Sequence, residues 1–126
     1  MKLTKVHHVA IIGSDYEKSR HFYADVLGFQ VLREVYRAER DDWMLNLQLD
    51  DLEIELFIMK DHPKRPSYPE AYGLRHLAFR VDSVEDTVRE LNEKGIPTEP
   101  IRTDTCTGEK MTFFSDPDGL PLEIHE

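Results

Sequence analysis

The sequence has one cysteine, few basic residues and no long hydrophobic run, and each shortage excludes a class of protein. Cys106 alone rules out an internal disulfide and any CxxC redox or zinc-ribbon motif. No apolar run approaches the ~18 residues of a membrane-spanning helix, and the N-terminal residues lack the small-residue cleavage site of a secretory leader. We therefore expect a cytoplasmic protein with no membrane partner.

The shortage of basic residues bears on nucleic acids. Sixteen basic residues against 25 acidic ones give a formal charge of -9, which opposes binding along a phosphate backbone. The hydrophobic share of 40% is too high for a disordered chain, and 126 residues is the usual size of one domain. These properties favour a compact domain that acts on a small molecule.

The two halves of the chain share residues at matched spacing. The segment His-Val-Ala at 8–10 is followed 68 residues later by His-Leu-Ala at 76–78. Glu55 is followed by Glu123 after the same 68 residues, so that in each half the histidine precedes the glutamate by 47 residues. This agreement indicates an internal duplication.

Hydrophobic periodicity and turn residues predict the order βαβββ in each half. A strand is expected at 6–12, followed by a helix that a capping box opens at Ser14 and Gly28 ends. The second half has a strand at 75–81 and a helix between Ser83 and Gly95. The remaining predicted strands are 29–38, 43–49 and 52–59, then 98–102, 110–115 and 120–125.

The fold class predicted from this pattern is α+β. We expect one domain over residues 1–126, made of a module at 1–60, a linker at 61–72 that contains prolines, and a module at 73–126.

Strand alternation indicates which way the repeated residues point. Aliphatic residues occupy the opposite parity in their strands and can pack under the helices. His8, Glu55, His76 and Glu123 are therefore expected on the other faces of their sheets. Two imidazoles and two carboxylates can bind a divalent first-row metal, and imidazole suits nickel, cobalt, zinc or iron. Taken singly, each histidine can instead be a hydrogen-bonded strand residue and each glutamate a solvated one.

The other candidate residues have no repeat partner. Parity predicts that His7 points away from His8, and structural or surface roles are expected for His7, His21, His62 and His125. Cys106 is either a reactive loop thiol or inert. Arg102 and Lys110 either anchor an anionic substrate tail or lie in solvent.

Five segments together resemble the vicinal oxygen chelate superfamily over nearly the full length, and in particular its small bacterial glyoxalase I group. These segments are HHVAI, HFYADVLGF, LEIEL, GLRHLAFRVD and FFSDPDGLPLEI. The stretch RPSYPEAYGLRHL is similar to a glyoxalase-like subgroup. The resemblance implies the glyoxalase/bleomycin resistance/dioxygenase fold, in which two βαβββ modules form curled mixed sheets around a metal site. It also implies the metal ligands His8, Glu55, His76 and Glu123, and a homodimer with two shared sites.

The resemblance further implies an activity. A glyoxalase I converts the hemithioacetal of a 2-oxoaldehyde such as methylglyoxal and a thiol into a 2-hydroxyacyl thioester, through a metal-bound enediolate. By analogy Glu123 is the catalytic base and Glu55 its partner, with nickel or cobalt favoured over zinc or manganese as the cofactor. Ile12 and Met59 stand where glutathione-using members have arginine and asparagine, so the resemblance implies a thiol other than glutathione.

Two other functions stay open. A related dioxygenase or thiol transferase generally uses two histidines and one glutamate, which leaves Glu55 unexplained. A module that binds a small molecule or drug without chemistry commonly lacks the metal ligands.

Overall fold

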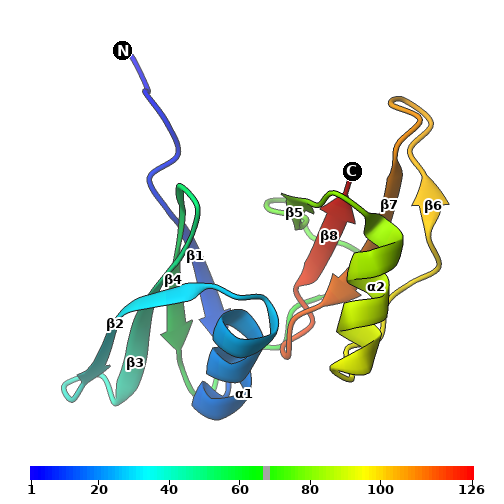
Figure 1. Cartoon of the computed structure of the whole chain (residues 1–126). Coiled ribbons are helices and arrows are strands. Elements are labelled where there is room, and N and C mark those ends of the chain that lie inside the picture. Colours follow the sequence, from blue (N-terminus) through cyan, green and yellow to red (C-terminus); the bar gives the residue numbers. More distant parts are fainter. Residues whose placement is uncertain (67–68) are drawn as a thin grey trace. The chain divides into compact units, whose positions relative to one another are not determined.

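The computed structural model describes residues 1–66 and 69–126, which form two compact units, Met1–Pro63 and Lys64–Glu126. Residues 67 and 68, which belong to the predicted linker and to the stretch RPSYPEAYGLRHL, lie outside the described residues. Each unit contains a four-stranded sheet and one helical segment (Figure 1). In the described part of the chain, no helix has the length and apolar character needed to cross a membrane.

The first unit has the sheet order β1-β4-β3-β2, with β1 parallel to β4 and the other pairs antiparallel. Its elements are β1 (Val9–Gly13), α1 (Tyr16–Arg20), the π-helix η1 (His21–Val26), β2 (Gln30–Arg37), β3 (Asp42–Leu49) and β4 (Leu52–Ile58). The second unit repeats this plan as β5-β8-β7-β6, with β5 parallel to β8. Its elements are β5 (Leu77–Arg80), α2 (Val84–Glu93), β6 (Arg102–Thr103), β7 (Lys110–Ser115) and β8 (Pro121–His125).

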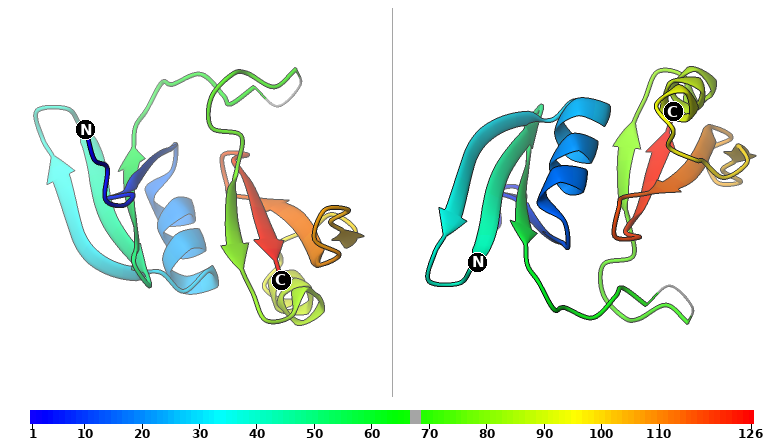
Figure 2. Two further views of the ribbon diagram at one scale, coloured as in Figure 1. Left: turned by 90° about the horizontal axis from the view of Figure 1, so that it is seen from above. Right: turned by 90° about the horizontal axis from the view of Figure 1, so that it is seen from below.

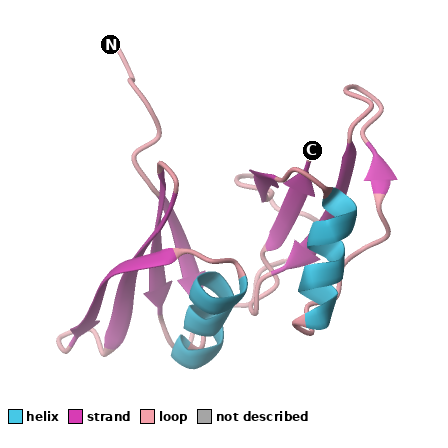
Figure 3. Ribbon diagram, in the orientation of Figure 1, coloured by secondary structure: helices cyan, strands magenta, loops and turns pink. Residues whose placement is uncertain are grey.

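The predicted α+β class and the order βαβββ are confirmed in both units. In each unit the helical segment lies against one side of its own sheet, and the sheet curls without closing into a barrel (Figures 2 and 3). The side of the sheet away from the helix is therefore free to carry polar side chains.

The hydrophobic core of each unit lies between its sheet and its helical segment. Alternate residues of β4 are buried, namely Ile54, Leu56 and Ile58, and so are Leu122 and Ile124 of β8. The helical segments contribute Phe22, Tyr23, Val84 and Leu91 to the buried set. Burial of this kind supplies about 25 cal/mol per Å² of apolar surface. The alternation in β4 places Glu55 on the other face, whereas in β8 Glu123 is buried as well and its contact with His76 shows which side it takes.

Three predicted boundaries are wrong. The first strand begins at Val9 rather than at residue 6, so His8 precedes the strand. The N-cap of α1 is Asp15, whose carboxylate accepts a hydrogen bond from the Lys18 backbone N–H at 2.9 Å, and not Ser14. Asp and Ser cap helices about equally well, so the capping box could not separate them. The strand expected at 98–102 is reduced to β6, which comprises only Arg102 and Thr103.

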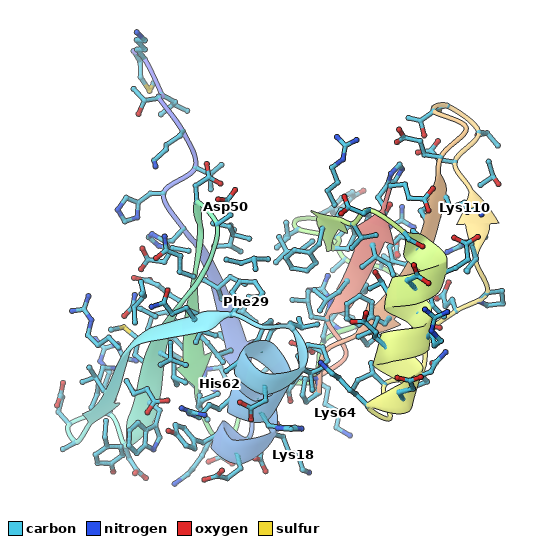
Figure 4. The ribbon with its side chains drawn as sticks, in the orientation of Figure 1. Lys18, Phe29, Asp50, His62, Lys64 and Lys110 are labelled. Carbon is cyan, nitrogen blue, oxygen red and sulfur yellow. The ribbon has the colours of Figure 1, made fainter. Side chains whose placement is uncertain are left out.

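Two turns set the registers that position the predicted glutamates. Asp50, at the tip of the β3–β4 hairpin (Figure 4), takes a left-handed backbone conformation with φ of 51°. In the turn between β7 and β8, the Asp116 carboxylate accepts hydrogen bonds from the backbone N–H groups of Asp118 and Leu120, both at 2.9 Å. These short connections hold β4 against β3 and β8 against β7, which places Glu55 and Glu123 mid-strand.

Candidate metal centre and adjoining cleft

Each unit brings one of the predicted histidines next to one of the predicted glutamates. In the first unit, His8 Nε2 lies 3.3 Å from Glu55 Oε2. In the second, His76 Nε2 lies 2.9 Å from Glu123 Oε2. The same register produces both contacts, because Ala10 lies opposite Glu55 and Ala78 lies opposite Glu123 on parallel strands. Each histidine comes two residues before that alanine, and its contact with the glutamate shows that its side chain lies on the same side of the sheet.

The donor atoms suit a divalent cation. Imidazole nitrogen and carboxylate oxygen are the ligands that first-row metals accept in open sites. Among the described residues, no three or more His, Cys, Asp or Glu side chains gather closely enough to hold an ion. Each unit therefore provides a pair of candidate donors.

His7 contacts His8, so the predicted orientation of His7 is wrong. The two Nδ1 atoms are 2.9 Å apart, which is hydrogen-bond distance. Both residues precede β1, and strand parity does not govern them there. A hydrogen bond at Nδ1 fixes the orientation of the His8 ring and leaves its Nε2 directed to Glu55.

The two His–Glu pairs have different neighbours. Asn46 of β3 lies opposite Glu55, whereas Phe113 of β7 lies opposite Glu123. The Asn46 amide donates to Glu53 Oε1 at 2.7 Å, and its buried Oδ1 has no hydrogen-bond partner among the described residues. The Phe113 ring meets the His76 ring edge-on, with centroids 5.1 Å apart. One glutamate thus has an amide as its cross-strand neighbour, and the other has an aromatic ring.

Neither neighbour was identified from the sequence. Asn46 of β3 is buried between the buried Leu45 and Leu47, so an asparagine inside an apolar run was the available signal. Phe113 gave no signal, because an aromatic residue in a strand is ordinary core composition.

A cleft of about 710 Å³ adjoins His76 within the second unit. Its lining includes Phe113 and three arginines, Arg65, Arg75 and Arg102. The guanidinium carbon of Arg102 lies 5.3 Å from the Phe113 ring centroid, in cation–π contact. His76, Phe113 and Arg102 therefore form a series of contacts that leads from the candidate donors into the cleft.

The remaining candidates have other roles. Lys110 on β7 (Figure 4) pairs with Glu85 of α2, and this contact raises the pKa of Lys110 and lowers that of Glu85. The Lys110 ammonium is thus engaged in holding the helix to the sheet. The pKa of His125 is raised, mainly by its hydrogen bond to the Glu126 carbonyl and to a smaller extent by its hydrogen bond to the Asp104 carboxylate. Cys106 is exposed, and its backbone N–H donates to Asp104 Oδ1 at 2.7 Å.

The other two histidines have structural or surface contacts, as expected. His21 Nδ1 lies 2.9 Å from Asp25 Oδ2, one turn away on the same helical segment. His62 Nδ1 lies 2.8 Å from the Lys60 carbonyl oxygen. Both contacts are exposed, so neither suggests a further metal site.

Close relatives cover the whole chain. The uncharacterized protein YwkD of Bacillus subtilis (strain 168) is 58% identical over 127 residues, which span 100% of this chain and 99% of that protein. The crystal structure of the glyoxalase family protein from Enterococcus faecalis is 56% identical and covers 100% of both chains with a TM-score of 0.94.

Relatives named for an activity are more distant. Metallothiol transferase FosB of Staphylococcus saprophyticus is 29% identical over 98% of this chain and 77% of its own. Mouse mitochondrial methylmalonyl-CoA epimerase is 32% identical over 75% of this chain and 56% of its own. The trypanothione-dependent glyoxalase I of Leishmania major is 25% identical, with a TM-score of 0.74 over 98% of this chain and 87% of that one.

The family model described as Glyoxalase/Bleomycin resistance protein/Dioxygenase superfamily matches residues 5–124. Together with the relatives that cover the whole chain, this match confirms the resemblance seen in the sequence, and the chain belongs to this superfamily.

Proposed function

We propose that this chain is a metal-dependent lyase or isomerase of the glyoxalase type. It would convert the hemithioacetal of a 2-oxoaldehyde and a thiol into a 2-hydroxyacyl thioester. The observation that carries the proposal is the duplicated His–Glu contact, at 3.3 Å in one unit and 2.9 Å in the other, reached through the same strand register.

In this proposal His8, Glu55, His76 and Glu123 together hold one divalent cation, nickel or cobalt by preference. Two donors from each pair give the four protein ligands of an open site. The pairs would meet either within one chain or between the chains of a homodimer. A bound cation would stabilise the negative charge that develops on two neighbouring substrate oxygens.

The proposed role of Glu123 is to move the proton between the two reacting carbons. Its carboxylate would take the proton from one carbon and return it to the next, as general base and then general acid. The Glu123 side chain is 10% exposed, against 25% for Glu55. Bulk water therefore has less access to the carboxylate of Glu123, which favours return of the same proton to the substrate. Glu55 is assigned as its partner on the opposite side.

The thiol is proposed to be other than glutathione. Ile12 lies on β1 and its side chain is half-exposed, while the backbone N–H of Met59 donates to the Gly13 carbonyl at 3.0 Å. Neither side chain can pair with a carboxylate or donate a hydrogen bond to one. The two positions that bind glutathione in the related enzymes therefore offer only apolar contact here.

The test is turnover after controlled metal loading. The protein is stripped with a chelator and dialysed, then reloaded with nickel, cobalt, zinc or manganese and assayed with methylglyoxal and several thiols. We expect activity to return when about one equivalent of metal is bound per chain. Glu123→Gln should lower kcat by about 10²–10⁴-fold with an unchanged circular dichroism spectrum.

Glu90→Gln is the matched control, because Glu90 is an exposed residue of α2 that faces solvent. It should leave kcat and metal content unchanged. Absence of thioester product with every thiol and metal, in protein that binds a stoichiometric metal, would show that the chemistry is different.

A further inference from the structure

The arginine-lined cleft of the second unit has a different balance of charge from the chain as a whole. The charged residues that line it are Arg65, Arg75, Arg102, Glu70, Glu99 and Asp116. Three positive and three negative groups balance here, whereas the whole chain carries 25 acidic residues against 16 basic ones. The cleft therefore repels an anion less than the average surface of this protein does.

The carboxylates of the cleft are already engaged by neighbours. Glu70 pairs with Arg75 at 3.2 Å, and Glu99 pairs with Arg102 at 2.9 Å. The Asp116 carboxylate accepts backbone N–H groups of its own turn. Both ion pairs are largely exposed, and exposed pairs contribute only about 0–1 kcal/mol. An incoming anion can therefore replace Glu99 on Arg102 at little cost.

Arg102 is the arginine best placed to act together with the His76–Glu123 pair. The Phe113 centroid is 5.1 Å from the His76 ring and 5.3 Å from the Arg102 guanidinium carbon, so the guanidinium is at most about 10 Å from the imidazole. The aromatic contact holds the planar guanidinium, which presents paired N–H donors that match a carboxylate or phosphate. A ligand a few atoms long can span this distance.

A second arginine supports the same wall of the cleft. Arg65 Nη2 donates to the backbone carbonyls of Leu74 at 2.7 Å and Arg75 at 3.0 Å. Among the described residues it forms no ion pair with a carboxylate. Its positive charge therefore adds to the field of the cleft beside the segment that leads into His76.

We propose that this cleft is an anion subsite, in which Arg102 binds the carboxylate or phosphate group of a short substrate whose reactive end lies at His76 and Glu123. The inference rests on the proposed function for the reactive end, but the anion subsite itself exists without metal or turnover. The substrate class it assigns is a small acid, recognised through the second unit at Arg102 and not through the positions of Ile12 and Met59.

The test measures anion binding to metal-free protein. Malonate and inorganic phosphate are titrated separately, with binding followed by NMR shifts of the Arg102 and Phe113 signals, and uncharged malonamide is the ligand control. We expect saturable binding of at least one anion and none of malonamide. The stronger of the two identifies whether the natural group is a carboxylate or a phosphate.

Three variants test whether anion binding depends on Arg102 itself or only on the overall charge of the protein. Arg102→Met should weaken anion binding by about tenfold or more, the value of a charged hydrogen bond. Glu99→Gln should strengthen it several-fold, because the competing carboxylate is gone. Arg89→Met is the matched control. Arg89 pairs with Asp86, three residues before it, just as Arg102 pairs with Glu99, and both ion pairs are exposed, but Arg89 lies outside the cleft.

The outcomes distinguish this proposal from the proposed function. Equal loss of binding in Arg102→Met and Arg89→Met, or no saturable binding at all, would overturn the subsite even if metal-dependent turnover were found. Arg102-dependent binding in a protein that no metal activates would support the subsite and contradict the lyase.

Discussion

Two adjacent isoleucines test the assignment of the sheet faces, on which the whole candidate site depends. Ile11 and Ile12 share β1 and pair with consecutive residues of β4, Leu56 and Phe57. Ile11 is 5% exposed and Ile12 is 50% exposed. Replacement of each by alanine changes the same number of atoms in the same strand, so the difference between the two variants reports only which face is packed.

The expected cost follows from burial. Ile11→Ala removes a side chain from the core and should destabilise the fold by about 2–5 kcal/mol. Ile12→Ala should cost no more than about 1 kcal/mol, through β-propensity and partial exposure. With a urea m-value of about 1–3 kcal/mol per M, the two midpoints should differ by roughly 1 M.

Urea unfolding followed by tryptophan fluorescence measures this difference. Trp43 is the single tryptophan of the chain and lies in the same sheet, where Tyr16 and Tyr36 contact it at centroid distances of 4.7 and 5.4 Å. Its emission therefore follows the unit that contains both isoleucines. Equal midpoints would contradict the assignment of the packed face, and a larger loss for Ile12→Ala would mean that the faces are reversed and that His8 and Glu55 point into the core.

Three further predictions follow from local structure. The Arg37 guanidinium lowers the pKa of Asp42, so this carboxylate stabilises the fold above its unfolded pKa and the contribution is lost as the pH falls through the folded value. Asp42→Asn should therefore show a shallower loss of stability on acidification than the parent protein, and identical acid titrations would refute this. Ser83→Ala removes the N-cap of α2 and should cost about 0.5–2 kcal/mol in urea unfolding, whereas an unchanged midpoint would deny the cap any energetic role. Gly28 has φ of 81° with open space around its Cα, so Gly28→Ala should cost about 1–2 kcal/mol through backbone strain alone, and a stabilised variant would contradict that conformation.

The repeat and the strand faces could be read from the sequence because both are patterns in the order of residue types and need no knowledge of tertiary contacts. The 68-residue offset located His8, Glu55, His76 and Glu123, and alternation in β4 correctly separated the buried aliphatic residues from Glu55, whereas Glu123 of β8 is buried like its neighbours. Their role as metal ligands stays a prediction. The domain boundaries at 1–60, 61–72 and 73–126 also stay a prediction.

The errors arose where tertiary packing decides local structure. The predicted helix after Ser14 changes into the π-helix η1 at His21, where Phe22 and Tyr23 are buried against the core, and no propensity scale encodes that packing. Asn46 and the Arg102–Phe113 stack were missed for a related reason. Cross-strand neighbours depend on register, and register depends on the turns and bulges of the folded sheet.

The solitary thiol gives this protein a built-in attachment point. Cys106 is exposed in the second unit, and no other cysteine competes for a maleimide dye. The indole of Trp43 in the first unit is a natural donor fluorophore for such a dye, so no substitution in the chain is needed. Dilution of labelled chains with an excess of unlabelled ones would then separate energy transfer inside one molecule from transfer between molecules, and so test whether the proposed four-ligand site forms within one chain or between two.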